Sequence, residues 1–182
     1  VGIEVVRVPV LGAQERQPVG PAGGEVGRHH LQIDEPVGLR IAAHYYNVNR
    51  RQHGGKLEAV LNAKRVSADR RGSVVLDIER GGARDLQARP WQTDTCIGGW
   101  HYDRALAERH GYKKSGDVLR TLADIVSKNG NLLLSIPVRG DGTIDADEVK
   151  FLEEVAAWMG VNGEAIFGTR PWAVYGEGPS TT

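Results

Sequence analysis

Carboxylates and a cation stand directly after a short apolar run in the middle of the chain. The run covers residues 74–76, and Asp77, Glu79 and Arg80 follow it before a Gly81–Gly82 pair. Carboxylates can transfer protons, and α/β proteins place their chemistry at the carboxyl ends of parallel strands. This stretch is therefore the first place where we expect a functional site.

A second group of polar and aromatic side chains follows a few residues later. Residues 90–95 can form a further strand, and the loop after it carries a Gly98–Gly99 pair, Trp100 and His101. The pattern repeats that of the first stretch, with chemistry-bearing side chains where a strand ends. We expect the two groups to meet at one edge of a sheet.

No metal site is expected from the sequence. Residues 137–148 resemble an EF-hand loop at some positions, but positions 1 and 3 are Pro137 and Arg139, which supply no carboxylate. A strand, not a helix, is expected before that loop. Cys96 is the single cysteine, which excludes an internal disulfide framework, and we expect a buried, inert thiol.

The elements that position these groups follow from periodicity and from end signals. A continuous apolar run at residues 131–137 predicts a strand that is buried on both faces. Asp145 and Glu148 form a capping pattern at the start of one helix, and Asn129–Gly130 is a stop signal at the end of an earlier helix. We predict strands over residues 39–46, 74–79, 90–95 and 131–137, helices over 115–128 and 146–159, a weak strand over 1–11 and short strands over 165–167 and 172–175; residues 56–61 fit a helix or a strand.

Strands separated by helices predict parallel pairing through βαβ crossovers. A complete (β/α)₈ barrel needs ~250 residues, so four strands make about half of one. The predicted fold class is α/β, a partial (β/α)₈ TIM barrel.

Composition excludes several classes of function. The formal net charge is zero, whereas a nucleic-acid interface needs a basic patch or stripe. There is no apolar run of ~18 residues, so we expect no membrane span. No secretory signal is visible in the residues given.

The first 37 residues differ from the rest. All eleven aromatic residues lie between Tyr45 and Tyr175, and residues 1–37 are rich in Gly, Pro, Val and Arg. They are either a flexible segment or foreign to the domain, for example translated from another frame. We place a domain boundary after residue 37.

Five runs together resemble the α-L-fucosidases, family 29 of the glycoside hydrolases: GLRIAAHYYN, LDIERG, PWQTDTCIGGWHY, DIVSKNGNLLLSIPVRGDGTID and NGEAIFGTRPW. The resemblance covers about residues 38–179. It implies that residues 38–168 hold the last four strands of a (β/α)₈ catalytic barrel and that residues 169–182 begin a C-terminal β-sandwich.

The resemblance also implies a chemistry. The family's enzymes are retaining exo-glycosidases that remove terminal L-fucose from glycans through a covalent intermediate, with an Asp nucleophile and a Glu acid/base. Retention requires the two carboxyls to lie ~5 to 5.5 Å apart, and the acid needs a raised pKa. The family uses no cofactor, and its members are often secreted or periplasmic.

Five positions carry the family's site residues. Glu79 matches the acid/base, with Asp77 as the rival carboxylate, and Trp100 matches a tryptophan beside the sugar. The substrate-binding set is Trp100, His101, Trp91 and His44. The alternatives are that Glu79 forms an ion pair with Arg80 or a rim arginine, that Trp91 belongs to the core, and that the histidines are structural.

The family's nucleophile has no counterpart. Asp34 and Glu25 lie before residue 38 but lack the flanking motif. We therefore expect a truncated or frameshifted fucosidase that is inactive alone. The alternatives are a non-catalytic remnant that self-associates through exposed sheet edges, or a fucose-binding module.

Overall fold

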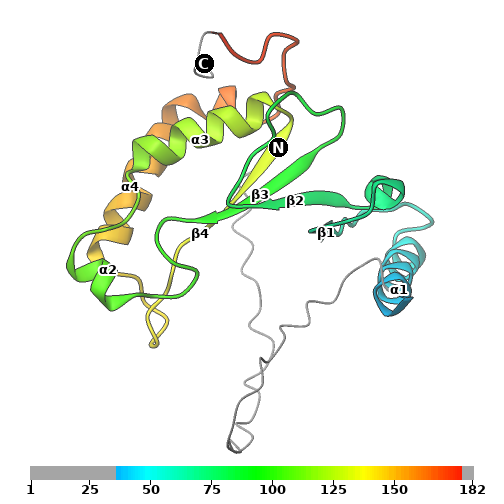
Figure 1. Ribbon diagram of the computed structural model, residues 1–182, viewed down its shortest axis with the longest axis horizontal. Helices are drawn as coiled ribbons and strands as arrows, with labels where there is room; N and C mark the ends of the chain where they lie inside the picture. Colours follow the sequence, from blue (N-terminus) through cyan, green and yellow to red (C-terminus); the bar gives the residue numbers. More distant parts are fainter. Residues whose placement is uncertain (1–35, 178–182) are drawn as a thin grey trace, which may run out of the picture.

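The computed structural model describes residues 36–177, which contain a parallel sheet with helices along one face (Figure 1). In chain order the elements are α1 Pro36–Gln52, β1 Asn62–Ala63, the 3₁₀ helix η1 Ala68–Ser73, β2 Val75–Glu79, β3 Trp91–Cys96, α2 Arg104–Glu108, α3 Ser115–Ser127, β4 Gly130–Ser135, α4 Ala146–Asn162 and the 3₁₀ helix η2 Gly163–Ala165.

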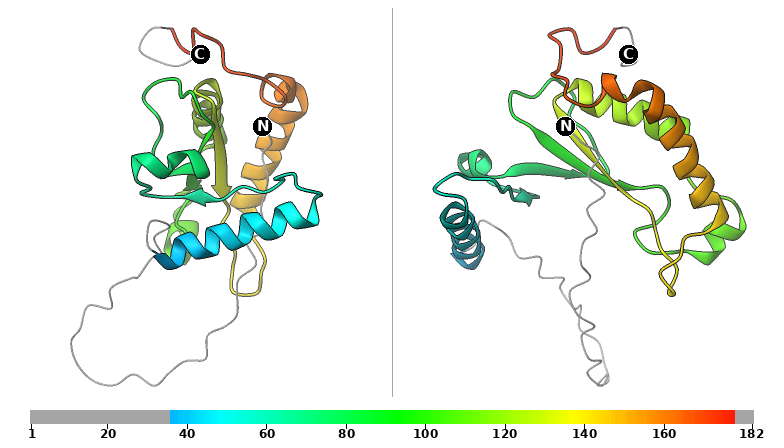
Figure 2. Two further views of the ribbon diagram at one scale, coloured as in Figure 1. Left: turned by 90° about the vertical axis from the view of Figure 1, so that its right-hand side faces the viewer. Right: turned by 180° about the vertical axis from the view of Figure 1, so that it is seen from behind.

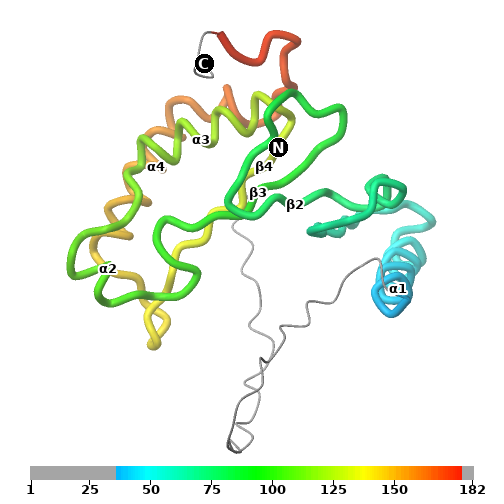
Figure 3. Tube along the Cα trace, viewed as in Figure 1, coloured from blue at the N-terminus to red at the C-terminus, as the bar shows by residue number. Residues whose placement is uncertain are grey.

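The four strands lie in the order β1-β2-β3-β4, and every neighbouring pair is parallel. Parallel neighbours need a crossover, and Figure 3 shows the chain leaving β3, passing through α2 and α3 and returning along β4. This confirms the α/β class and the parallel sheet.

Helices α3 and α4 lie together on one side of the sheet, and α1 lies beyond the β1 edge (Figures 1 and 2). Strand alternation sends Trp91 and Leu132 to the helix-covered side, where both are at least 96% buried. They pack with the apolar stripes of the two helices. The buried cluster consists of Trp91, Ile97, Val118, Leu122, Ile125, Leu132, Phe151 and Ile166.

The predicted strand over residues 39–46 is wrong, because these residues belong to helix α1. A short apolar run fits a buried strand or a helix equally well by pattern alone. Ile41 is 51% exposed, so the run is not a buried strand. Tyr46 instead fastens the helix to the sheet edge: its hydroxyl donates to the Ser73 carbonyl at 2.6 Å and accepts from the Leu61 N–H at 3.2 Å.

The first strand of the sheet is β1, which was not predicted. Residues 56–61, which fitted either a helix or a strand, form neither. Helix α2 was also missed. The two short strands predicted over 165–167 and 172–175 do not form, since residues 163–165 make a 3₁₀ helix and residues 172–175 contain no strand.

The other predicted elements are confirmed with small shifts of their ends. The capping box of α4 forms, with each of Asp145 and Glu148 accepting the backbone N–H of the other. Helix α4 continues past Gly160 to Asn162. Asn129 adopts the left-handed conformation, φ 67°, that ends α3.

The apolar side chains of α4 are buried to different extents. Phe151 is 4% exposed, whereas Val149 and Leu152 are 40% and 37% exposed. The weak strand expected over residues 1–11 lies outside the described residues. Within residues 36–177, no helix combines the length and the apolar character that a bilayer crossing needs.

We predict that Gly130→Ala destabilises the fold. A Cβ at Gly130 would lie 2.6 Å from the Trp91 ring and 2.7 Å from Ile125, so the core must shift at a cost of about 1–3 kcal/mol. Urea unfolding measures the change. Gly140→Ala is the matched control, because a Cβ there meets no atom within 4 Å; equal midpoints for the two variants would contradict the prediction.

Candidate active site

The polar face of the sheet is set by the register of β2 and β3. Asp77 pairs with Gln92 and Glu79 pairs with Asp94. Because side chains alternate along a strand, these four lie on the face opposite to the one that packs against α3 and α4. Glu79 ends β2, so the carboxylates gather at the carboxyl end of the sheet.

Lys64 joins the carboxyl ends of three strands. It directly follows β1, and its Nζ lies 3.1 Å from Glu79 Oε2 and 2.7 Å from Asp94 Oδ2. Like charges that lie directly opposite each other on neighbouring strands are destabilising. The ammonium group offsets this repulsion by pairing with both carboxylates.

This ion pair favours the ionised form of Glu79. The Lys64 hydrogen bond, followed by the Lys64 charge, lowers the pKa of Glu79, and Arg80 and a hydrogen bond from Trp100 add to this. Burial by itself would lower the pKa of Lys64, but the hydrogen bonds to Asp94 and Glu79 raise it overall. Both groups are therefore charged in this structure.

The pKa of Asp77, the rival carboxylate, is shifted in the opposite direction. Burial, followed by the charge of Asp94, raises the pKa of Asp77. Within the described part of the chain, Asp77 Oδ1 and Asp94 Oδ1 are buried and have no hydrogen-bond partner. Two buried carboxylate oxygens beside the ion pair thus lack a hydrogen bond.

The structure brings Glu79 and Trp100 together. The Trp100 side chain lies near enough to Glu79 to add to the lowering of its pKa, and one face of its indole is covered by Arg80, whose guanidinium carbon is 4.7 Å from the ring centroid. The alternative partner of Glu79 was Arg80, but the side chain that forms the ion pair is Lys64.

The other three predicted residues lie elsewhere or stand alone. Trp91 begins β3, is 3% exposed and donates its indole N–H to the Lys128 carbonyl at 2.9 Å, as its core alternative requires. His44 is exposed on α1, and His101 is exposed beside Trp100. Glu79 and Trp100 thus lie together, with His101 next to Trp100 in the chain, and the roles of all three stay predictions.

Sequence reasoning missed Lys64 and did not single out Asp94. Asp94 was recognisable, since it alternates with Gln92 in a predicted strand that follows the Glu79 strand. Lys64 was not, because β1 has two residues and no apolar run. Among residues 36–177 no group of three or more His, Cys, Asp or Glu side chains could hold a metal ion.

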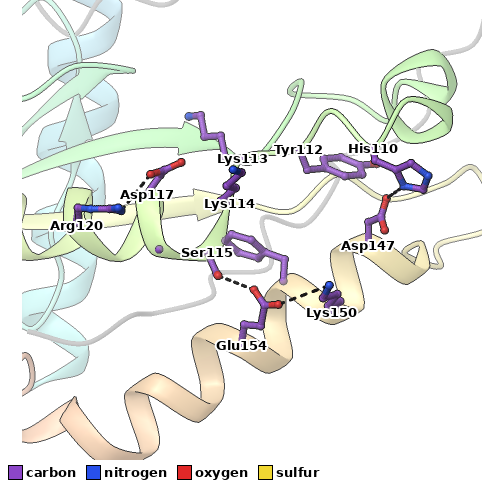
Figure 4. A pocket seen from close by; sticks show the side chains of 12 residues that line it. His110, Tyr112, Lys113, Lys114, Ser115, Asp117, Arg120, Asp147, Lys150 and Glu154 are labelled. Atoms are coloured by element: carbon purple, nitrogen blue, oxygen red, sulfur yellow. Dashed lines mark hydrogen bonds and ion pairs between the residues drawn. The ribbon is translucent and has the colours of Figure 1, made fainter.

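A pocket of about 490 Å³ lies between the start of α3 and α4, away from Glu79 (Figure 4). Two pairs of polar side chains lie in its lining: Ser115 Oγ donates to Glu154 at 2.6 Å, and His110 Nδ1 lies 2.6 Å from Asp147 Oδ2. Lys114 holds the N-cap position of α3. These pairs link the α2–α3 segment to α4.

The profile of the family described as Alpha-L-fucosidase matches residues 37–164. The chain belongs to the alpha-L-fucosidase family. It is 33% identical over 101 residues to the tissue alpha-L-fucosidase of Homo sapiens and 28% identical over 107 residues to the alpha-L-fucosidase of Dictyostelium discoideum. These matches cover 54% and 58% of this chain.

Solved structures show the same similarity. An alpha-L-fucosidase superposes with a TM-score of 0.64 at 26% identity, and the Thermotoga maritima alpha-fucosidase, in complex with a mechanism-based inhibitor, with a TM-score of 0.61 at 26% identity. Each match covers 76% of this chain and 30% of the other. The matches also cover only 22% and 23% of the human and Dictyostelium proteins. The chain therefore belongs to a family of glycoside hydrolases and spans under a third of these relatives.

We predict that Lys64→Met raises the pKa of Glu79, because the hydrogen bond and charge that lower it are removed. A carboxyl whose folded pKa is lowered stabilises the fold above its unfolded pKa, and this contribution is lost as the pH falls through the folded pKa. The stability difference between wild type and Lys64→Met should therefore be largest near pH ~7 and shrink near pH ~3.

A ¹³C NMR titration of the Glu79 carboxyl carbon, assigned with Glu79→Gln, measures the pKa directly. Lys150→Met is the control, because Lys150 pairs with Glu154 on α4 at 4.0 Å. An unchanged Glu79 titration in Lys64→Met would refute the role of the ion pair.

Proposed function

We propose that this chain forms part of the catalytic domain of a retaining exo-α-L-fucosidase, which hydrolyses terminal L-fucose from glycans. The observation that carries this proposal is the position of Glu79: it ends β2 on the polar face and lies beside Trp100. Family membership and the parallel sheet support it. We propose further that residues 38–168 are the last part of a (β/α)₈ barrel, that residues 169–182 begin a β-sandwich domain and that residues 1–37 stand outside the barrel.

In the proposed reaction Glu79 acts first as an acid and then as a base. Its proton goes to the glycosidic oxygen while an Asp carboxylate attacks the anomeric carbon, so that the leaving alcohol departs and a covalent fucosyl-enzyme forms. Glu79 then removes a proton from water, whose oxygen attacks the same carbon and releases fucose. Trp100 offers its flat indole to the apolar face of the sugar.

The ion pair with Lys64 sets a condition on this mechanism. A general acid must hold its proton near the working pH, whereas Lys64 lowers the pKa of Glu79. Lys64 has a second partner, Asp94, at the shorter distance of 2.7 Å. The proposal therefore requires Lys64 to stay with Asp94 while the bound sugar separates it from Glu79.

A second candidate function is fucose binding without hydrolysis. It is favoured by the ion pair with Lys64, because a Glu79 that remains ionised cannot donate a proton. Trp100 would then serve only to stack on the apolar face of the sugar. Both candidates require binding, and measurable turnover would exclude the second.

We expect the 182-residue chain to bind L-fucose in a titration followed by isothermal calorimetry. Trp100→Ala should weaken binding by about tenfold or more, since the stacking surface is lost. Trp172→Ala is the matched control, because Trp172 is 74% exposed near the end of the described chain. Equal losses in both variants would reject Trp100 as the sugar platform.

We also expect no hydrolysis of 4-nitrophenyl α-L-fucoside by this chain, because no residue matches the family's nucleophile motif. Release of 4-nitrophenol is followed by absorbance. Measurable turnover that persists in Glu79→Gln would reject Glu79 as the acid/base.

The sheet itself suggests self-association. In the described residues β1 and β4 each pair on one side only, and unpaired strand edges favour pairing with another chain. Sedimentation velocity across a concentration series tests this, and a monomer at every concentration would reject it.

A further inference from the structure

The turn that ends β2 holds a residue in a costly conformation. Arg80 has φ 50°, a left-handed value that side chains other than glycine rarely adopt. Its N–H donates to the Asp94 carbonyl at 2.8 Å. Thr93 Oγ1 lies 2.7 Å from the carbonyl oxygens of both Ile78 and Gly81, so the backbone on either side of Arg80 is held by β3.

This arrangement directs the Arg80 side chain to the segment that carries Trp100. Its guanidinium carbon lies 4.7 Å from the indole centroid, and its Nη2 donates to Cys96 Sγ at 3.3 Å. Cys96 is 1% exposed, and its thiol donates to the Gly98 carbonyl at 2.8 Å. The guanidinium group thus has two contacts, a hydrogen bond to a buried thiol and a stack on an aromatic face.

The contact with Arg80 restricts the Trp100 side chain. It follows the Gly98–Gly99 pair, so its backbone alone restricts it weakly. With Arg80 on one face of the indole, a sugar can stack only on the other face. A planar guanidinium stacks well on an aromatic ring, whereas an ammonium group does not match its shape.

We propose that Arg80 is a positioning residue, which fixes the Trp100 indole beside Glu79 and leaves one face for the fucose ring. This inference rests on the proposed function of Trp100 as the sugar platform. Nothing in the role requires Arg80 to touch the sugar.

Three variants of the full chain test the inference. Arg80→Gly removes the side chain and suits the positive φ, so the fold is kept. Arg80→Lys keeps the charge near Glu79 but loses the planar stack. Arg84→Gly is the control, since Arg84 is exposed in the same loop. Urea unfolding of each variant shows that it remains folded.

The first readout needs no sugar. Acrylamide quenching of Trp100 is obtained by subtracting, in each background, the signal of the Trp100→Phe counterpart, which removes the other tryptophans. We expect Arg80→Gly and Arg80→Lys to raise the Trp100 quenching constant and Arg84→Gly to leave it unchanged. Unchanged quenching in Arg80→Gly would overturn the inference.

The second readout is the dissociation constant for L-fucose. We expect Arg80→Gly and Arg80→Lys to weaken binding about two- to fivefold, the size of an exposed cation–π contact. Full rescue by Arg80→Lys would show that charge, not stacking, matters, and would overturn the inference. Absence of L-fucose binding by the wild-type chain would overturn the proposed function and with it the sugar role, while the quenching result would show separately whether the Arg80–Trp100 contact exists.

Discussion

The contact on which the polar face depends is the bridge from Lys64 to Glu79 and Asp94. The two carboxylates face each other because β2 and β3 pair in parallel register, and Lys64 lies within 3.1 Å of both. The apolar face fixes that register. A slip of one strand by one residue would turn all its side chains to the other face. In β2 this would bring Glu79 into the core, and in β3 it would expose Trp91. The packing of Trp91 under α3 therefore determines where the charges meet.

The parts of the fold that sequence predicts well are those with local signals. The apolar run of β4 is long and continuous, and α4 begins at a reciprocal cap between Asp145 and Glu148. Residues 39–46 show the limit of such reasoning. Their apolar content suits a strand, but whether they form one depends on neighbouring strands that the local sequence does not reveal. In the structure Tyr46 finds its partners on the β1–β2 edge, and the segment is helical.

The site was predictable to the extent that its residues follow recognisable strands. Glu79 and Trp100 were found in this way, and the structure brings them together. Lys64 follows a strand of two residues that has no hydrophobic pattern, so its ion pair with Glu79 is visible only in the structure. Arg80 was considered only as an ion-pair partner of Glu79. Its contact with Trp100 depends on a positive φ, which no sequence pattern marks outside glycine and asparagine.

The charge balance at the bridge decides between the two proposed functions. The Asp94 side chain is 16% exposed and that of Glu79 is 51% exposed. When a sugar excludes water, the less exposed pair gains more from the lower local dielectric. Lys64 is also nearer to Asp94, so it should remain there as the site fills. Glu79 would then lose the hydrogen bond that lowers its pKa and enter a drier environment, and both changes raise the pKa of a carboxyl. The same bridge that keeps Glu79 ionised in the empty site is thus compatible with a protonated Glu79 in the occupied one, provided that the glycosidic oxygen takes the place of Lys64.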